Sequence, residues 1–310
     1  MTFEEFLDEW KNEAPYITVK TSGSTGQPKT IKLNKEFVRA SARRTNSYFS
    51  ISERSRLHSC VAADYIGGKM MAVRSELVDC RFTWETPSNR PLLSLGKEEE
   101  IDLLAVVPSQ MLHIVNNIDT MPELKAIIIG GAPLHPKLKR RIIESGLNAF
   151  ETYGMTETAS HIALRRVAAD EEWFKPLQGI GVSLDERGCL AIYFESGESI
   201  VTNDIAQLSP DGGFRIMGRY DNVIITGGKK VNPEDLELRI APFIESNFII
   251  TSSPDEKWGQ RIVLRIEGRP EDASSIIRKL RPIVMPYELP KDVEWVERLP
   301  RTPNGKLLRR

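Results

Sequence analysis

The segment from residue 125 to 146, "KAIIIGGAPLHPKLKRRIIESG", constrains the fold more strongly than any other part of the chain. An apolar run comes first, then a Gly-Gly-Ala-Pro turn, and then a cationic amphipathic pattern that ends at Gly146. A strand followed directly by a turn and a helix is typical of α/β proteins, in which the helix returns the chain to a parallel neighbour. Comparable apolar runs occur in "YITVK", "IDLLAVV", "CLAIYF" and "NVIITGG". We therefore predict an α/β fold with a mostly parallel sheet.

The chain is long enough for two domains, because its 310 residues are 40% hydrophobic. After Gly188 the strand-like runs become shorter and closer together, which predicts a small β-meander or barrel beside the main sheet. The polar stretch "GRYD" at 218–221 then separates two apolar runs. These features predict a large N-terminal domain over 1–220 and a small, mobile α+β C-terminal domain over 221–310.

Charge and cysteine content exclude several classes of protein. Forty-two basic and 43 acidic residues leave a net charge of −1, so no overall field attracts nucleic acid or an anionic membrane. No apolar stretch is long enough to span a bilayer. Three widely spaced cysteines form neither a disulfide framework nor a C-x-x-C metal motif: Cys60, Cys80 and Cys189. We expect a cytoplasmic protein with no nucleic-acid and no membrane partner.

The N-terminal segment has the pattern of a helix that packs on the body of the protein. Residues 1–13 are acidic and resemble neither a signal peptide nor a transit peptide. Four apolar side chains fall on one helical face: Phe3, Phe6, Leu7 and Trp10.

A loop rich in hydroxyl residues and glycine, "TSGSTGQPKT", covers residues 21–30. It does not match the Walker pattern, because Pro28 stands where a second glycine is required. Its glycines would still let backbone N–H groups converge on an anion, with hydroxyl donors and one lysine beside them. A flexible turn before a helix starting near Asn34 is the alternative, and the stretch alone leaves both interpretations open.

The same stretch resembles the phosphate loop [ST]-S-G-[ST]-T-G-x-P-K of the adenylate-forming superfamily, which includes acyl-CoA synthetases, luciferases and peptide-synthetase adenylation domains. Five further matches follow in the family's order: "IGGAP" at 129–133, "ETYGMTET" at 151–158, "TNDIA" at 202–206, "GRYDNVIITGGKKVNPEDLE" at 218–237 and "LPRTPNGKLLRR" at 299–310. The chain is therefore identified as a member of this superfamily, and the resemblance implies ATP, Mg²⁺ and coenzyme A as cofactors and co-substrates.

The resemblance implies a role for each motif in holding ATP. The phosphate loop would grip the β- and γ-phosphates through Thr21, Ser22, Gly23, Ser24, Thr25, Gly26 and Lys29. The adenine would lie between a flat backbone turn and the next motif, formed by Gly130, Gly131, Ala132, Pro133, Tyr153, Gly154 and Met155. Thr156 would contact the α-phosphate, and Glu157 would bind Mg²⁺. Without the family, Glu157 is equally well interpreted as a carboxylate at a helix start.

The remaining motifs imply a catalytic cycle with two half-reactions. Asp204 would accept hydrogen bonds from the ribose, and Arg219 would assist at the sugar or the phosphates. Asp221 would be the hinge of the C-terminal domain, and Lys306 the lysine that reaches the substrate carboxylate and the α-phosphate. After rotation, Gly227 and Gly228 would approach the pantetheine arm. The pair Lys229 and Lys230 would meet a phosphate of coenzyme A or simply be solvated.

One stretch bears on the acid substrate. The sequence "AADYIGGKMMAVRSELV" and the following "GMTETASH" resemble 2-succinylbenzoate–CoA ligases of menaquinone biosynthesis. That substrate has two carboxylates, so one must be recognised while the other reacts. The implied acid-binding residues are Tyr65, Gly68, Arg74, Ser160 and His161. Tyr65 replaces the usual histidine and His161 the usual glutamine, and a surface Arg74 paired with Glu76 or Glu36 is the alternative.

The phosphate loop begins at residue 21, so we expect an N-terminal region shortened relative to the family and a homo-oligomer that covers an exposed edge. Other hypotheses stay open at this point. The chain would otherwise be another aryl- or acyl-CoA ligase, an adenylation enzyme that loads a carrier protein, or a nucleotide-binding remnant without activity.

Overall fold

The computed structural model describes residues 1–20, 29–270, 272–300 and 309. The chain divides into two compact units, Met1–Gly181 and Val182–Arg310. The boundary expected after residue 220 lies inside the second unit, and the motion expected there stays a prediction.

The first unit is built on a seven-stranded sheet in the order β11-β10-β9-β8-β6-β3-β4. Five neighbouring strands, from β4 to β9, are parallel, and β10 and β11 continue the sheet antiparallel. This arrangement confirms the mostly parallel α/β sheet. The strands are β3 (Arg56–Ser59), β4 (Arg81–Trp84), β6 (Leu103–Val106), β8 (Ile127–Ile129), β9 (Ala149–Met155), β10 (Ser160–Arg166) and β11 (Lys175–Pro176).

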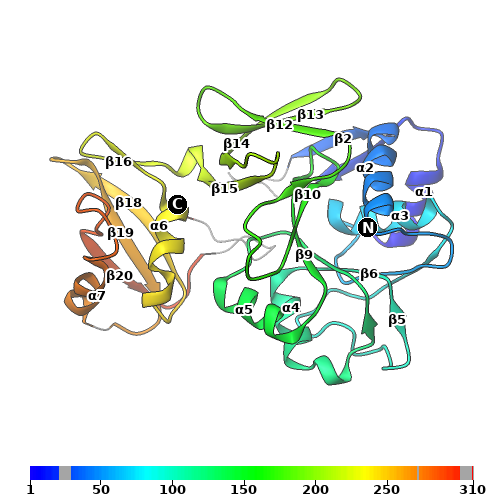
Figure 1. The fold of residues 1–310 in the computed structure, drawn as a ribbon, viewed down its shortest axis with the longest axis horizontal. Helices are drawn as coiled ribbons and strands as arrows, with labels where there is room; N and C mark the ends of the chain where they lie inside the picture. The colour runs from blue at the N-terminus through cyan, green and yellow to red at the C-terminus, as the bar shows by residue number, and fades with distance from the viewer. Residues whose placement is uncertain (21–28, 271, 301–308, 310) are drawn as a thin grey trace. The chain divides into compact units, whose positions relative to one another are not determined.

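Helices cover both faces of this sheet (Figure 1). On one face lie α4 (Pro108–Asn116) and α5 (Pro136–Ser145), whose Met111 and Ile142 belong to one core cluster with the sheet. On the other face, Met71 of α3 (Ile66–Glu76) packs in a second cluster. Fully burying an aliphatic side chain of this size contributes about 1.5–3 kcal/mol. The predicted strand, turn and helix of 125–146 are confirmed, with α5 ending at Gly146 in a left-handed conformation (φ 73°).

An antiparallel hairpin of β1 (Tyr16–Lys20) and β2 (Thr30–Asn34) precedes the main sheet. It packs in one core cluster with α1 (Phe3–Lys11), α2 (Lys35–Tyr48) and α3, which confirms that the N-terminal helix lies on the body of the protein. The sequence did not predict β2. Most of the proposed phosphate loop, 21–28, connects the two strands and lies outside the described residues.

The second unit contains an antiparallel sheet and a mixed sheet, in which β20 pairs with β19 in parallel. The predicted meander is a four-stranded sheet of β12 (Ile180–Leu184), β13 (Cys189–Phe194), β14 (Ser199–Leu208) and β15 (Phe214–Arg219). After the short 3-10 helix η2 (Tyr220–Asn222), a five-stranded sheet has α6 and α7 packed on one face. Its elements are β16 (Ile224–Thr226), β17 (Lys229–Val231), α6 (Pro233–Ile240), β18 (Phe248–Asp255), β19 (Gly259–Glu267), α7 (Ala273–Leu280) and β20 (Asp292–Val296).

The described residues also form four minor elements: β5 (Glu100–Ile101), β7 (Glu123–Leu124), η1 (Ile118–Thr120) and η3 (Ala241–Phe243). Within the described ranges, none of the helices is both long enough and apolar enough to cross a membrane.

Candidate active site

The turn Gly130–Pro133 follows β8 at the carboxyl end of the parallel strands, the edge at which open α/β sheets bind ligands. The Gly130 N–H donates to the Val106 carbonyl at 3.0 Å. Gly131 has φ +90°, which glycine adopts without steric cost. The Leu134 N–H donates to Glu151 Oε1 at 3.1 Å, which anchors the other end of the turn. The turn is therefore held at both ends, and Gly131 and Pro133 are exposed between them.

The hairpin between β9 and β10 carries the motif "ETYGMTET" at 151–158. Tyr153 is half-buried, and its ring lies 5.9 Å from that of Phe174. A Cβ atom on Gly154 would lie 2.2 Å from the Ser160 carbonyl oxygen, so only glycine allows the two strands to approach this closely. Gly154 in "YGMTET" is therefore required for the packing of the hairpin, in addition to the binding role that the motif implies.

Thr156 and Glu157 lie in the tight turn that closes this hairpin. The Thr158 hydroxyl accepts the Met155 N–H at 2.9 Å and fixes the turn from inside. No helix begins here, so the interpretation of Glu157 as a helix-start carboxylate is wrong. Its side chain is exposed at the tip of the turn, where an oxygen ligand is accessible to a hard cation such as Mg²⁺.

Arg74 is completely buried in α3, at 0% exposure. Its Nη1 lies 3.4 Å from Met71 Sδ, and its Nε and Nη2 have no hydrogen-bond partner among the described residues. Burial lowers the pKa of Arg74 to about 9. The alternative of a surface arginine paired with Glu76 or Glu36 is wrong. In the structure Glu76 pairs with Lys11, and Glu36 pairs with Arg39.

Polar groups from α2 and β10 lie around this arginine. The Asn46 side-chain amide donates to the Arg74 carbonyl at 2.8 Å, while Asn46 Oδ1 has no partner among the described residues. His161 is buried, and its Nε2 lies 3.0 Å from Thr45 Oγ1. Burial, and then the charge of Arg74, lower the pKa of His161 well below its usual value, so it is neutral at pH 7.

Thr45 and Asn46 were missed in the sequence, although a signal was present. Ser41 and Thr45 lie four residues apart on α2, and both are buried. Ser41 Oγ donates to the Ala159 carbonyl at 2.7 Å, just before Ser160. Buried hydroxyl residues at helical spacing indicate a polar interface rather than a solvated face.

The other predicted acid-binding residues lie at the start of α3 and at the start of β10. Tyr65 is the N-cap residue of α3, and 40% of it is exposed. A Cβ atom on Gly68 would meet the Ala62 carbonyl oxygen at 2.2 Å, so this glycine permits a close backbone approach. Ser160 adopts φ 83°, an uncommon conformation for a residue other than glycine.

In the second unit, Arg219 joins two of the predicted residues. Arg219 lies opposite Asp204 in the β14–β15 ladder, and its Nη1 donates to Asp204 Oδ1 at 3.1 Å. Its Nη2 donates to Asp221 Oδ2 at 3.0 Å. Asn203 also donates to Asp221, at 3.2 Å to Oδ2. The residues expected at the ribose and at the hinge thus form one ion-paired group.

Gly227 and Gly228 form the turn between β16 and β17, with φ of 55° and 76°. A Cβ atom on Gly227 would lie 2.6 Å from the Trp258 ring. Lys229 and Lys230 are exposed on β17, which leaves both earlier interpretations of this pair open.

Lys306 and the loop residues 21–28 lie outside the described residues, whereas Lys29 is described and exposed just before β2. Arg309, three positions after Lys306, is held firmly. Its guanidinium pairs with Glu234 at 3.0 Å and donates to Glu237, and its Nη1 donates to the Ile250 carbonyl at 2.9 Å.

This chain is similar in sequence and fold to known proteins. The family model described as "AMP-binding enzyme" matches residues 5–188. The acyl-CoA synthetase (AMP-forming)/AMP-acid ligase II-like protein from Dyadobacter fermentans DSM 18053 is 33% identical, over 98% of this chain and 90% of that chain, with a TM-score of 0.65. The 2-succinylbenzoate–CoA ligase of Bacillus cereus (strain ATCC 10987 / NRS 248) is 23% identical, over 98% of this chain and 70% of that enzyme.

A further solved structure is similar in fold. It is the o-succinylbenzoate CoA synthetase (MenE) from Bacillus subtilis in complex with the acyl-adenylate intermediate OSB-AMP, with 21% identity, a TM-score of 0.82, and coverage of 94% of this chain and 67% of that chain. This similarity confirms the predicted fold class. Because the family model matches more than half of the residues, and because the Dyadobacter protein is similar over almost the full length, this chain belongs to the AMP-binding enzyme family.

Proposed function

We propose that this chain is an AMP-forming acid–CoA ligase for an aromatic dicarboxylic acid, with 2-succinylbenzoate as the preferred substrate. The observation that carries the choice of acid is Arg74, fully buried with two guanidinium nitrogens unpaired among the described residues. The names of the Bacillus relatives support the same choice, although their low identity transfers only the fold.

A buried cation without a partner costs several kcal/mol, and a carboxylate that binds it in bidentate geometry removes this cost. The carboxylate that reacts at the α-phosphate cannot bind Arg74 at the same time, whereas a second carboxylate on the same acid can. His161 is neutral, so it adds no charge that competes with the acid for the cation.

In the first half-reaction, a carboxylate oxygen of the acid attacks the α-phosphorus of ATP, and the bond to the pyrophosphate oxygen breaks. The turn at Gly130–Pro133 and the ring of Tyr153 would hold the adenine. Thr156 would donate to the α-phosphate, and Glu157 would hold Mg²⁺, which neutralises phosphate charge when bound. Lys306 and the loop containing Lys29 would stabilise the charge that develops.

In the second half-reaction, the sulfur of coenzyme A attacks the acyl carbon, AMP leaves with the bridging oxygen, and the thiol proton passes to solvent. The C-terminal part would rotate about Asp221 and withdraw Lys306. Gly227, where a Cβ atom would collide with Trp258, and Gly228, whose positive φ disfavours other residues, would then lie along the pantetheine arm.

The test is pyrophosphate release with ATP, Mg²⁺ and a panel of acids, with and without coenzyme A. The panel pairs 2-succinylbenzoate with an analogue that lacks the succinyl carboxylate. We expect release with 2-succinylbenzoate, a thioester when coenzyme A is present, and a value of kcat/KM at least tenfold lower with the analogue.

Arg74→Lys gives the matched control within the chain. It keeps the charge but loses the bidentate geometry, so the preference between the two acids should shrink while the reaction itself persists. Equal use of both acids by the unaltered protein would contradict the dicarboxylate proposal. Pyrophosphate release without thioester formation from coenzyme A would favour a carrier-loading enzyme, and no release with any acid would favour a remnant without activity.

A further inference from the structure

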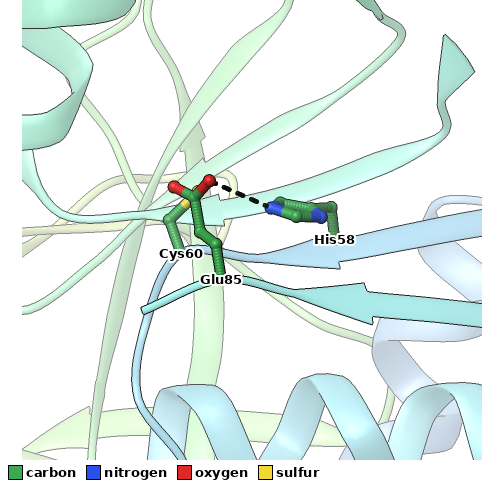
Figure 2. Close-up of side chains that lie close together, drawn as sticks. All are labelled: His58, Cys60 and Glu85. Atoms are coloured by element: carbon green, nitrogen blue, oxygen red, sulfur yellow. Dashed lines mark ion pairs between the residues drawn. The ribbon is translucent and has the colours of Figure 1, made fainter. Parts of the chain in front are cut away.

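Three potential metal-ligating side chains, none of them among the site residues discussed above, meet in the first unit. His58 lies on β3, Cys60 follows the end of β3, and Glu85 follows the end of β4. One ligand atom from each lies within 4.8 Å of the other two. Figure 2 shows the three side chains converging at the ends of these neighbouring parallel strands.

The imidazole of His58 is oriented with one nitrogen toward the cluster. Its Nδ1 lies 2.8 Å from Thr83 Oγ1, and the Thr83 hydroxyl donates to the Leu57 carbonyl at 3.4 Å. In the tautomer in which Nδ1 donates to Thr83 Oγ1, Nε2 carries the lone pair that a metal ion requires. His58 is 2% exposed, and its Nε2 has no hydrogen-bond partner among the described residues, at 3.9 Å from Glu85 Oε2.

Glu85 is also fixed in place. Its two carboxylate oxygens accept the Leu92 N–H, at 3.1 and 3.0 Å. Its side chain is only 16% exposed, and in the described part of the chain no lysine or arginine pairs with it. The carboxylate is therefore largely shielded from solvent, and it lies beside the imidazole nitrogen of His58 and the Cys60 thiol, which hydrogen-bonds to it.

We propose that His58 Nε2, Cys60 Sγ and the Glu85 carboxylate bind one divalent transition-metal ion of the zinc type. Imidazole, thiolate and carboxylate are the ligand types that zinc takes, whereas Mg²⁺ and Ca²⁺ take oxygen ligands. A tetrahedral ion with bonds of about 2.0–2.3 Å keeps its ligand atoms roughly 3.3–3.8 Å apart. The His58–Glu85 distance of 3.9 Å nearly satisfies this spacing, and the widest separation of 4.8 Å requires a contraction of about 1 Å.

The ion would position the elements around it rather than take part in acid activation. It would tie together the ends of β3 and β4, while Gln110 of α4 already holds the Cys60 carbonyl at 2.8 Å. The chain that leaves Cys60 leads directly to Tyr65 and α3. Binding replaces the Cys60 S–H bond by a sulfur–metal bond and releases the proton to solvent, so the bound state has a thiolate. The partly exposed Glu85 leaves room for water as a fourth ligand.

Cobalt(II) is the probe that tests this site, because a cobalt–thiolate bond gives a charge-transfer absorption band and reports the sulfur ligand directly. The untagged full chain is freed of metal with a chelator, kept reduced with a phosphine, and titrated with Co²⁺ and then with Zn²⁺. We expect one equivalent of Co²⁺ to produce the band and one equivalent of Zn²⁺ to remove it. Cys60→Ala should abolish the band, whereas Cys189→Ala, at another buried cysteine, should keep it.

Glu85→Gln provides a second variant that keeps the shape of the side chain and an acceptor for the Leu92 N–H. It should retain the cobalt–thiolate band and lower the Zn²⁺ affinity at least tenfold. This variant also decides the matter if Cys60→Ala fails to fold by circular dichroism. The proposal is overturned if the unaltered protein gives no thiolate band, if Cys60→Ala keeps the band, or if Glu85→Gln binds Zn²⁺ with unchanged affinity.

Discussion

Arg74 occupies an environment that is unusual for a charged side chain. It lies in a helix whose residues from 68 to 75 are all buried, and the described residues offer its guanidinium one sulfur contact and no carboxylate. Under the proposed function, such a position lowers the stability of the ligand-free protein, and the second carboxylate of the acid relieves this cost on binding. Function and stability are therefore in opposition at this residue.

This opposition predicts the effect of Arg74→Met on stability. The substitution keeps most of the volume and removes the buried charge, so the free energy of unfolding should increase by about 1 kcal/mol or more, while activity with the dicarboxylic acid is lost. Arg39→Met, on the partly exposed pair with Glu36, should change stability by less than about 1 kcal/mol. Urea unfolding of the ligand-free variants measures both. A large loss of stability in Arg74→Met would show that the arginine has a structural role.

The same residue predicts a pH dependence. Burial lowers the pKa of Arg74 to about 9 in the folded protein, well below its value in the unfolded chain, so above about pH 9 the unfolded chain binds more protons. Stability from this group therefore increases as pH rises above about 9, because the burial penalty on the cation is relieved. The increase in the free energy of unfolding produced by Arg74→Met should be constant near neutral pH. It should become smaller above about pH 9, by up to about 1.4 kcal/mol per pH unit. An advantage that stays constant to about pH 10 would contradict this assignment.

The sequence located Arg74 but not its surroundings. Apart from Lys69, its neighbours in "IGGKMMAV" are apolar or glycine, which is the pattern of a buried helix and argues against a surface position for Arg74. His58, Cys60 and Glu85 had no such signal. They are separated by up to 27 positions and meet only because β3 and β4 are parallel neighbours, a pairing that no local pattern specifies.

At the scale of elements, the β9–β10 hairpin determines where Thr156 and Glu157 lie. Gly154→Ala places a Cβ atom 2.2 Å from a backbone oxygen that cannot move without opening the hairpin. We expect a loss of at least about 2 kcal/mol in the free energy of unfolding. Gly96→Ala, where a Cβ atom meets nothing within 4 Å, should change stability by less than about 0.5 kcal/mol. Thermal unfolding of the two variants checks the contrast, and equal melting temperatures would refute the close approach.

The C-terminal end is tied to α6 and β18 through Arg309, close in sequence to Lys306. If this anchor positions the lysine, Arg309→Met should slow acid-dependent pyrophosphate release about tenfold or more and spare thioester formation from preformed acyl-adenylate. Lys306→Ala should show the same selectivity more strongly. Arg261→Met removes an exposed ion pair with Asp292 and should affect neither half-reaction. Equal losses in both half-reactions for Arg309→Met would contradict the anchoring role.

The sequence predicted whether a segment is a helix or a strand where its hydrophobic periodicity was strong. It did not predict which strands pair with one another. The strand, turn and helix at 125–146 and the meander after Gly188 follow from local patterns, whereas β12, which precedes Gly188, was not predicted. The run "YITVK" is a strand as predicted, yet it pairs with β2 in a hairpin outside the main sheet. The alternating "TIKLN" of β2 contains lysine and asparagine, and its strand character depends on packing against α1 and α2 rather than on its composition.

At the scale of the whole molecule, the proposed function requires one chain to perform two chemically distinct half-reactions. The predicted acid-binding residues belong to the first unit, and the ion-paired group around Arg219 belongs to the second. A mechanism through an acyl-adenylate requires a specific transfer of oxygen, which depends on both half-reactions rather than on one residue. One oxygen of the substrate carboxylate must become the oxygen that AMP carries away.

The most direct test follows that oxygen. The protein is incubated with ATP, Mg²⁺, coenzyme A and 2-succinylbenzoate labelled in its carboxylates with a heavy oxygen isotope, and the products are analysed by mass spectrometry. The account predicts one labelled oxygen in each AMP, none in pyrophosphate, and one molecule of thioester for each AMP formed. Unlabelled AMP, or label in inorganic phosphate with ADP as the nucleotide product, would contradict it.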